Sequence, residues 1–462
     1  MNQTSQKQIY ETNKKERFSY GIYFFGQLIV YVIVLSFLQI FLTDIGIPAT
    51  AVAAVFLIAK IWDAINDPLF GIIVNRVNFK KGKYKPWLKI SAFIIPVCTT
   101  ALFAIPAGLS VGLKIALASV LYIAWDLSYT LCDIPVFSVV TAMTNNVRER
   151  TSVIARGRVL MFVGALAAGI VVPILYPVIG WFGAAAILSL IALGAMVPLG
   201  YAAKERHRPP AGAENPSIKE LILTVAQNKY LLLMVMSFII ANMTNTGVAV
   251  SGYFAIYCLG GPQIMSLLSL LGTIPVMVLS ALIPALTKKM DKFTLLLIVT
   301  GGAVLFSVLL FLTGYANLPL FLVINTLRGL CIALPGTLMP MFILDCAEYG
   351  QYKTGKNSTA LAVSLQTFAA KVYGALAGAI GMFILGLSGF ASGANAVQPP
   401  GVIRAIWLLI SIAPISGLLI GFIMLFMGYK LRDRDIQIMA RVNQGDLSRE
   451  EAEKLLSPAI AR

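Results

Sequence analysis

Residues 293–314 read FTLLLIVTGGAVLFSVLLFLTG and contain no charged side chain. An α-helix needs roughly 20 apolar residues to cross the hydrocarbon core of a bilayer, so this run predicts one transmembrane helix. Similar runs fill most of the chain, and they are too long and too continuously apolar for the alternating strands of a membrane barrel. We predict an all-α membrane protein with twelve transmembrane helices, over residues 18–42, 47–77, 87–107, 112–142, 153–176, 179–202, 229–258, 263–287, 293–314, 317–343, 358–388 and 402–429.

The composition agrees with a bilayer environment. Only 12% of the 462 residues are charged, whereas soluble domains carry about 25%. The net charge of +16 does not indicate a nucleic-acid partner, because lysines and arginines gather in alternate loops, as they do in cytoplasmic loops. We therefore expect a multi-pass protein of the cell (plasma or inner) membrane, in contact with lipid and with both termini in the cytoplasm. The five cysteines lack metal-ligand spacing, so no cofactor is expected.

One long polar segment interrupts the apolar runs and separates six predicted spans from six. This division is typical of transporters built from two pseudo-symmetric bundles. Near the end of the chain, Ser448 and Glu451 have capping-box spacing, which predicts a short helix near residues 449–456. We predict a first six-helix bundle over residues 1–202, a cytoplasmic linker over 203–228, a second six-helix bundle over 229–430 and a cytoplasmic tail over 431–462.

Ionisable side chains inside the predicted spans mark a candidate site, since each is costly at membrane depth unless it is paired or hydrated. Lys60, Asp63 and Asp67 share one helix face by their spacing. Asp126 and Asp133, seven residues apart, share another. Facing carboxylates repel unless one holds a proton or a hard cation lies between them. The pattern predicts a site for Na⁺ or H⁺; the alternative is a set of structural ion pairs, for example Lys60 with Asp63. Among the bases inside other spans, Arg158, Arg328 and Lys371 stand out.

Aromatic residues lie beside these charges. Trp125 and Tyr129 are four residues apart and flank Asp126, and Phe137 follows on the same span. Sugar rings pack their C–H faces on aromatic rings, while a few polar groups fix their orientation. The alternative is plain packing or the aromatic belt at a membrane surface. We select Trp125, Asp126, Tyr129 and Phe137 as candidate sugar contacts.

Several motifs resemble the signature of the glycoside–pentoside–hexuronide:cation symporters. They are KIWDAINDP at residues 60–68, GKYKPW at 82–87, YTLCDIP at 129–135, RER at 148–150, DCAEYGQYK at 345–353 and SLQTFAAK at 364–371. The motifs stand in the right order, and the whole resemblance extends from about residue 19 to about residue 380. The resemblance implies the major-facilitator fold and the symport of a sugar with a cation by alternating access.

The resemblance also implies roles for single residues. It implies a cation site made by Asp63, Asn66, Asp67, Thr130 and Asp133. Asp63 and Asp67 would be the metal ligands if the ion is Na⁺. The sugar-binding residues that it implies are Asp133, Arg158 and Lys371, with Gln366 and Thr367 beside that lysine.

The chain departs from the family pattern at several positions. The span 1 aspartate that recognises galactosides in the family is Leu28 here, beside Gln27. Asp126 and Arg328 have no counterpart in the pattern, although both remain candidate substrate contacts. The sugar is therefore left open, and one hypothesis is a carboxylated sugar held by three bases, Arg158, Arg328 and Lys371.

We predict a transporter rather than an enzyme. The one histidine, His207, falls in the linker, and no nucleophile–base or metal-ligand constellation is present in the sequence. Two alternatives stay open: a cation-independent facilitator of lipids or other small molecules on the same fold, and a membrane-embedded enzyme. We expect a monomer whose ligands are a small sugar and a coupling ion, Na⁺ or H⁺.

Overall fold

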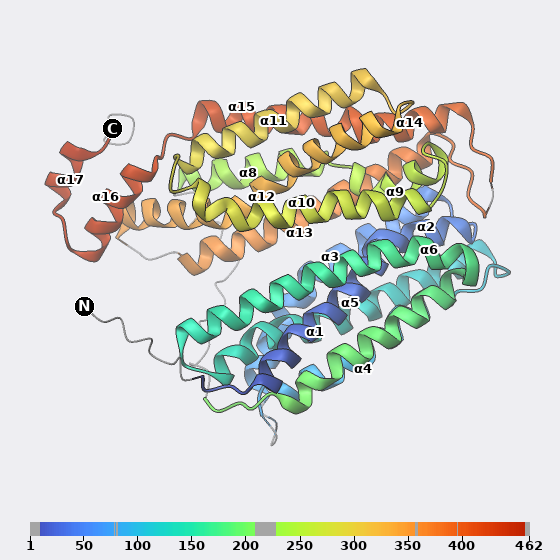
Figure 1. Ribbon diagram of the computed structural model, residues 1–462, viewed down its shortest axis with the longest axis horizontal. Coiled ribbons are helices and arrows are strands. Elements are labelled where there is room, and N and C mark those ends of the chain that lie inside the picture. The colour runs from blue at the N-terminus through green and yellow to red at the C-terminus, as the bar shows by residue number, and fades with distance from the viewer. Residues whose placement is uncertain are drawn as a thin grey trace. The chain divides into compact units, whose positions relative to one another are not determined.

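The computed structural model describes residues 10–77, 79, 82–207, 228–355, 359–394 and 396–457. Within these ranges it leaves out some side chains of the helices, among them that of Asp67. Every regular element in the described ranges is a helix (Figure 1), which confirms the all-α prediction. The elements are α1 (Lys14–Val32), the π-helical η1 (Ile33–Phe37), α2 (Leu38–Asp44), α3 (Ala49–Arg76), α4 (Lys85–Leu102), α5 (Val111–Met143), α6 (Val147–Ala202), α8 (Lys229–Met243), α9 (Gly247–Tyr257), α10 (Gln263–Leu286), α11 (Lys292–Thr313), α12 (Leu318–Thr354), α13 (Thr359–Leu387), α14 (Pro400–Ser411), α15 (Ala413–Gly428), α16 (Asp433–Gln444) and α17 (Arg449–Leu455).

Residue contacts divide the chain into two compact units. The division falls in the polar segment between α6 and α8, most of which lies outside the described residues, so the predicted bundle and linker boundaries stay predictions. Unit 1 is Met1–Glu214 with the short segments Met265–Ser269 and Ser392–Ala396, and unit 2 is Asn215–Ile264, Leu270–Ala391 and Val397–Arg462.

Nine helical segments of the described chain are long and apolar enough to cross a membrane. One of them, Arg148–Ala202, is 55 residues long and breaks at Gly180, whose φ of 75° is outside the helical region. This break lies just inside the second of the two predicted spans, 153–176 and 179–202. The helices α3 and α4 match two further predicted spans but are not among the nine, so the number twelve stays a prediction.

The helix that contains the tenth predicted span extends beyond the predicted end of that span at residue 343. The helix α12 continues to Thr354, three turns further, and stops at Gly355. Gly355 has a φ of 71°, the left-handed conformation in which glycine commonly terminates a helix. The polar residues after position 343 are therefore helical, because hydrophobicity marks only the part of a helix that lies in lipid.

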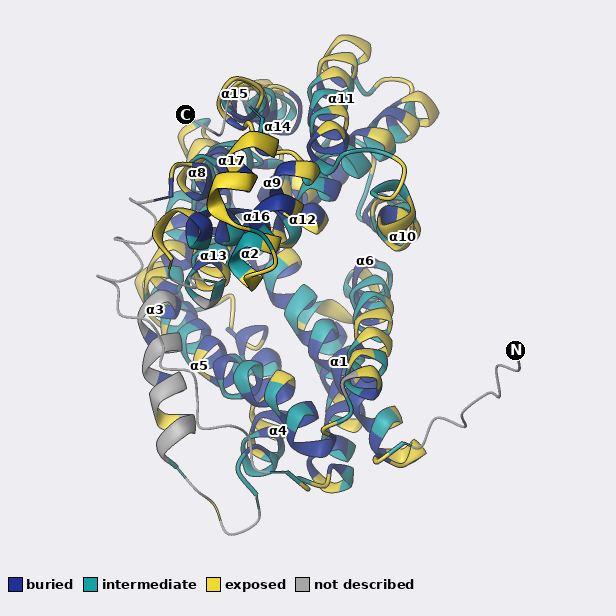
Figure 2. Ribbon diagram, turned by 90° about the vertical axis from the view of Figure 1, so that its left-hand side faces the viewer, coloured by how far each residue is buried: buried dark blue, intermediate teal, exposed yellow. Residues whose placement is uncertain are grey.

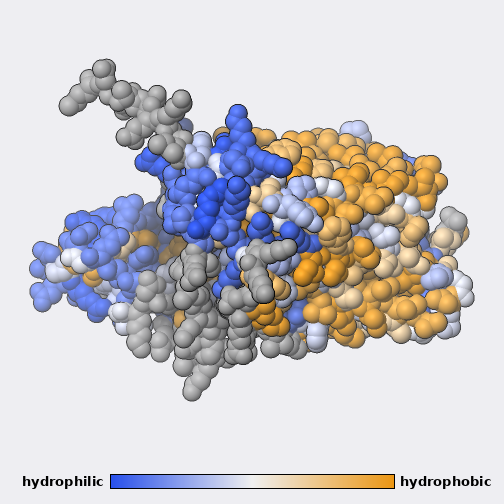
Figure 3. Space-filling view, turned by 90° about the horizontal axis from the view of Figure 1, so that it is seen from below, coloured by the Kyte–Doolittle hydropathy of each residue, from blue (hydrophilic) through white to orange (hydrophobic). Residues whose placement is uncertain are grey.

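Most helices bury one side and expose the other. Figure 2 shows buried and exposed residues alternating along the same helices. The face in Figure 3 is covered by hydrophobic side chains over much of its length, and hydrophilic ones gather towards one end. Val178 (80% exposed) and Leu312 (72%) are examples of large apolar residues on the surface. Apolar area this extensive marks a surface that meets lipid rather than water.

Glycines bring α1 and α6 together in unit 1. A Cβ on Gly26 would lie 2.7 Å from the carbonyl oxygen of Ala192, and one on Gly164 would overlap the backbone of Phe25. Small residues allow such close approach of membrane helices, where van der Waals packing replaces the hydrophobic effect. These glycines therefore allow α1 and α6 to form a closely packed helix pair in unit 1.

The tail is an integral part of unit 2. The Lys292 ammonium at the start of α11 lies 2.7 Å from Asp345 of α12 and 3.3 Å from Asp433 of α16. Arg449 of α17 donates a hydrogen bond of 2.9 Å to the carbonyl of Tyr352. These contacts tie α16 and α17 to the ends of α11 and α12.

The short helix predicted in the tail is confirmed. It spans Arg449–Leu455, and both hydrogen bonds of the capping box between Ser448 and Glu451 are present. The local sequence was sufficient to predict this helix, because a capping box satisfies backbone groups within one turn.

Candidate functional site

Polar side chains from three helices of unit 1 meet along α5. The amide of Asn66, on α3, donates a hydrogen bond of 2.9 Å to the hydroxyl of Thr130, on α5. Both residues are buried, with 7% and 4% of their surface exposed. We call the whole set the polar seam: Gln27 of α1, Lys60, Asp63 and Asn66 of α3, and Asp126, Thr130 and Asp133 of α5.

An ion pair lies within the seam. The Lys60 ammonium is 3.5 Å from the Asp63 carboxylate, one turn along α3. The structural pair considered as the alternative in the sequence analysis is therefore present. It does not exclude a cation site, because an ammonium that can move away leaves a buried carboxylate for another cation. Asp67 lies one further turn along α3, but its side chain is outside the described residues.

Asp133 is positioned by α1. The buried Gln27 amide donates a hydrogen bond of 3.2 Å to Oδ1 of Asp133 and one of 3.3 Å to the sulfur of Cys132. Asp133 itself is only half-buried, so part of this residue is accessible. The sequence analysis did not select Gln27; its position beside Leu28, where the family has a sugar-recognising acid, was the available signal.

The candidate aromatic residues form a stack rather than a set of open rings. Trp125 and Tyr129 stack with ring centroids 5.2 Å apart, and Tyr31 of α1 contacts the Tyr129 ring at 5.2 Å. The Trp125 indole N–H donates to the hydroxyl of Thr99 at 2.9 Å, and the residue is 1% exposed. Tyr129 is half-buried. Tyr129 therefore has surface that a ligand could contact, whereas Trp125 is buried and packs against the Tyr129 ring.

Phe137 lies further along α5. It is 52% exposed, and its ring packs against Phe24 of α1 at 5.5 Å. Arg158, on α6, is also exposed. The structure leaves both accessible on unit 1, and their contact with a sugar stays a prediction.

The other candidate residues belong to unit 2. On α13, Lys371 and Gln366 are half-buried, and Thr367 is exposed. Arg328, on α12, is 5% exposed and faces α11. Its guanidinium donates to the hydroxyl of Ser307 at 3.1 Å and to the Asn325 amide at 3.4 Å. These hydrogen bonds favour a packing role for Arg328.

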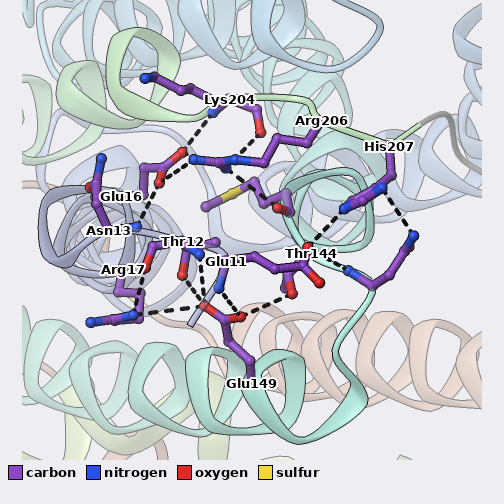
Figure 4. Close-up of polar contacts among 12 residues, drawn as sticks. Glu11, Thr12, Asn13, Glu16, Arg17, Thr144, Glu149, Lys204, Arg206 and His207 are labelled. Carbon is purple, nitrogen blue, oxygen red and sulfur yellow. Dashed lines mark hydrogen bonds and ion pairs between the residues drawn. The ribbon is translucent and has the colours of Figure 1, made fainter. Parts of the chain in front are cut away.

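A network of carboxylates at one end of unit 1 was not predicted from the sequence (Figure 4). The Glu149 side chain is completely buried and accepts hydrogen bonds from the backbone N–H groups of Glu11 and Thr12 at 2.9 and 3.0 Å. It also accepts from the Thr144 hydroxyl at 3.0 Å and lies 3.7 Å from Arg17. This one side chain thus joins the segment before α1 to the start of α6.

Two further carboxylates extend the network to the segment after α6. Glu16 receives two hydrogen bonds from the guanidinium of Arg206, at 2.8 and 2.9 Å, and these bonds raise the pKa of Arg206. Glu11 lies 2.8 Å from the ring of His207. The hydrogen bond with His207, followed by that from the Asn145 N–H, lowers the pKa of Glu11. The network holds the ends of α1, α5 and α6 together.

Comparisons with known proteins agree with this architecture. The nucleoside transporter NupG has a crystal structure that matches with a TM-score of 0.64 and 12% identity, over 90% of this chain and all of NupG (100%). The isoprimeverose transporter of Lactiplantibacillus pentosus is 27% identical over 445 residues, which are 93% of this chain and 91% of that protein. The glucuronide carrier protein homolog of Escherichia coli K12 is 28% identical over 413 residues, 86% of this chain and 88% of the relative.

These proteins are transporters and not enzymes, which confirms the prediction of a carrier. The family described as MFS/sugar transport protein matches residues 19–433. The match includes most of α1 and every element from η1 to α15, and the apolar helices among them make this a multi-pass membrane protein. The chain belongs to the MFS/sugar transport protein family.

Proposed function

We propose that this protein is a secondary active transporter that moves a sugar together with Na⁺ or H⁺ across the cell membrane by alternating access. Membership of the family supports a sugar as the cargo, and relatives named for isoprimeverose and glucuronide support a glycoside, pentoside or hexuronide. The observation that carries the proposal is the polar seam, where the Asn66–Thr130 and Gln27–Asp133 hydrogen bonds link three apolar helices.

The seam supplies the ligands that a small cation needs. Carboxylate, amide and hydroxyl oxygens suit hard cations such as Na⁺, and a carboxyl kept in a low dielectric can take up a proton instead. The cation would be held by Asp63, Asn66, Asp67, Thr130 and Asp133. Its charge offsets the cost of burying carboxylates.

The sugar would bind next to this ion. Asp133 and Arg158 hydrogen-bond its hydroxyls, Tyr129 covers one face of the ring with Trp125 behind it, and Phe137 borders the site. Because the cation and the sugar share Asp133, each raises the affinity for the other by the same factor. This reciprocal coupling makes the cation gradient drive sugar accumulation.

The resemblance to the symporter family also assigns sugar binding to Lys371, with Gln366 and Thr367 beside it on α13. Arg158 would supply a positive charge that suits a carboxylated sugar, and Lys371 is a second candidate for that role. Arg328 is not needed for this, since Ser307 and Asn325 already accept its hydrogen bonds. In the proposed carrier both termini face the cytoplasm, and the transporting unit is a monomer.

The test is counterflow in proteoliposomes with a panel of neutral and anionic glycosides, each with and without Na⁺ and at two pH values. The proposal requires that at least one glycoside is carried and that a cation gradient drives its uphill accumulation. Replacing Asp67 with Cys should abolish accumulation and spare downhill exchange. Uphill accumulation by Asp67→Cys at the wild-type level would refute the coupling role.

Other outcomes of the same assay point elsewhere. Cation-independent flux of lipids or other small molecules would identify a facilitator on this fold. Competition by neutral sugars but not by uronides would rule out a carboxylated cargo and leave sugar symport standing.

A further inference from the structure

Asp126 has no counterpart in the family pattern, yet it is 5% exposed in the middle of a membrane helix. Two contacts fix the register of α5 against α3. The Phe56 and Tyr122 rings lie 4.8 Å apart, and further along both helices Asn66 bonds Thr130 at 2.9 Å. Both helices run from the first contact towards the second, so the residues on their facing sides lie opposite one another in order between the two contacts.

This register sets Asp126 opposite the Lys60–Asp63 pair. Asp126 is one turn beyond Tyr122 and one turn before Thr130, and Lys60 and Asp63 lie between Phe56 and Asn66. The Lys60 ammonium, 3.5 Å from Asp63 on its own helix, also interacts electrostatically with Asp126 across the helix interface. One half-buried cation therefore has an ion-pair partner on its own helix and a second carboxylate opposite it on α5.

The two partners differ in what else they do. Asp63 belongs to the proposed cation site, whereas Asp126 lies one turn away from the Asn66–Thr130 contact. An ammonium at Asp63 competes with the coupling cation for the same oxygens. Moving it away would leave a buried charge without a partner, which is strongly unfavourable. A second carboxylate within reach removes most of that penalty.

We propose that Asp126 is the alternative counter-ion of Lys60, to which the ammonium transfers from Asp63 when the coupling cation binds. The inference rests on the proposed function and assigns Asp126 a positioning role in cation binding instead of a contact with the sugar. Lys60 stays charged throughout, so the exchange is a movement of its side chain only. By receiving the ammonium, Asp126 sets the affinity of the site for the cation.

The experiment measures uptake of a transported sugar against the concentration of the coupling cation, and compares the half-activating concentration among variants. Asp126→Asn removes the alternative partner, so the ammonium stays at Asp63 and the half-activating concentration should rise about tenfold, equivalent to about 1.4 kcal/mol. Asp126→Glu keeps a carboxylate, so its half-activating concentration should stay within about threefold of the wild-type value. A threefold change corresponds to about 0.7 kcal/mol, which we assign to the longer side chain.

Lys60 variants separate this role from a structural one. Lys60→Gln removes the competing ammonium and should lower the half-activating concentration. In the double variant Lys60→Gln/Asp126→Asn the concentration should fall back to the wild-type value or below. If the Asp126 side chain were needed only for folding, the half-activating concentration of the double variant would be as high as that of Asp126→Asn. Asp44→Asn, which alters a half-buried carboxylate bonded to Trp181 at 2.9 Å, is the matched control and should leave the value unchanged.

Each outcome decides one question. If the wild type depends on a cation but Asp126→Asn has the same half-activating concentration, or the double variant is not rescued, the inference is overturned and the proposed function stands. If sugar uptake by the wild type is independent of any cation, the proposed function itself fails. Should Asp126→Asn not fold, Lys60→Gln still decides, because an unchanged or raised half-activating concentration contradicts the exchange.

Discussion

The Gln27 amide lies 3.2 Å from the Asp133 carboxylate, so a buried donor on α1 holds one oxygen of the half-buried acid on α5. Gln27 is 2% exposed and its amide also contacts the Cys132 sulfur at 3.3 Å. The hydrogen bond helps to fix the direction of the carboxylate. The candidate sugar-binding acid is thus oriented before any ligand arrives.

Gln27→Leu should raise the Michaelis constant for the sugar. A hydrogen bond to a charged group contributes about 1.5 kcal/mol, which corresponds to about a tenfold weaker binding. The measurement is counterflow at saturating cation. Gln39→Leu, which alters another buried glutamine of unit 1 (5% exposed), serves as the control. Equal Michaelis constants for Gln27→Leu and the wild type would show that sugar binding does not depend on the orientation of Asp133 by Gln27.

Two threonines of unit 1 should separate cation binding from sugar binding. Thr130→Val deletes the acceptor of the Asn66 amide and should raise the half-activating cation concentration about fivefold, for a hydrogen bond of about 1 kcal/mol. Thr99→Val deletes the acceptor of the Trp125 indole and should change the Michaelis constant for the sugar instead. Uptake titrated separately in cation and in sugar measures both. A shift of the same constant by both variants would contradict this division.

The ion pair between Glu16 and Arg206 should stabilise unit 1. Arg206→Ala leaves the Glu16 carboxylate buried without its main partner. Breaking a fully buried pair costs about 3–5 kcal/mol; because 29% of the Arg206 side chain is exposed, we expect about 2 kcal/mol, read as a drop of several degrees in the thermal midpoint of the purified protein. Arg156→Ala, at an exposed position of α6, is the control. A comparable drop in that variant would mean that the pair is not the cause.

The Glu11–His207 contact should make stability depend on pH. The folded protein has a lowered Glu11 pKa, so the contact stabilises the fold above the ordinary value of 4.5 and stops doing so as the pH falls through the lowered value. Thermal midpoints between about pH 3 and pH 6 test this. The difference between the wild type and Glu11→Gln should be largest at the upper end and vanish at the lower end. A difference that is constant over the range would argue against the contact.

Gly82 should tolerate no side chain, because Glu205 fills the space beside it. Its φ is +113°, and a Cβ would lie 2.7 Å from Oε1 of Glu205. That carboxylate accepts the first backbone N–H groups around the start of α4, those of Lys83, Tyr84 and Lys85, at 2.6, 2.9 and 2.8 Å. The carboxylate therefore caps the N-terminus of α4.

Gly82→Ala should accordingly lower the thermal midpoint more than Gly355→Ala. Both positions carry the backbone strain of a positive φ, about 1–2 kcal/mol. Only Gly82→Ala also displaces a helix cap, which adds about 1 kcal/mol, since a Cβ on Gly355 meets nothing within 4 Å. Equal losses in the two variants would show that the Glu205 cap is dispensable.

The sequence predicted what depends on periodicity and on local chemistry. Apolar runs located the helices, and spacing put Lys60 and Asp63 on one face of α3. Spacing does not say which neighbour a face meets, and for this reason Arg328 was selected as a substrate contact although it faces Ser307 on α11. That α3 meets α5 at Asn66 and Thr130 followed only from the resemblance to a known family.

The carboxylate network at the end of unit 1 lay beyond sequence reasoning for a different reason. Glu149 binds backbone N–H groups of Glu11 and Thr12, which are 138 and 137 positions away. Every residue has a backbone N–H, so no residue type marks these donors. Only the packing of the segment before α1 against the start of α6 selects them.

The bridge that Lys292 makes to Asp345 and Asp433 has a consequence for biosynthesis. Asp433 follows Lys292 by 141 positions, and at about 5–20 residues per second the ribosome needs roughly 7–28 s to make that stretch. Throughout this interval the helices of unit 2 that have already been made lack the contact between Lys292 and Asp433. Chains released early, before α16 is translated, would therefore lack the Asp433 contact of Lys292 and keep only the one to Asp345.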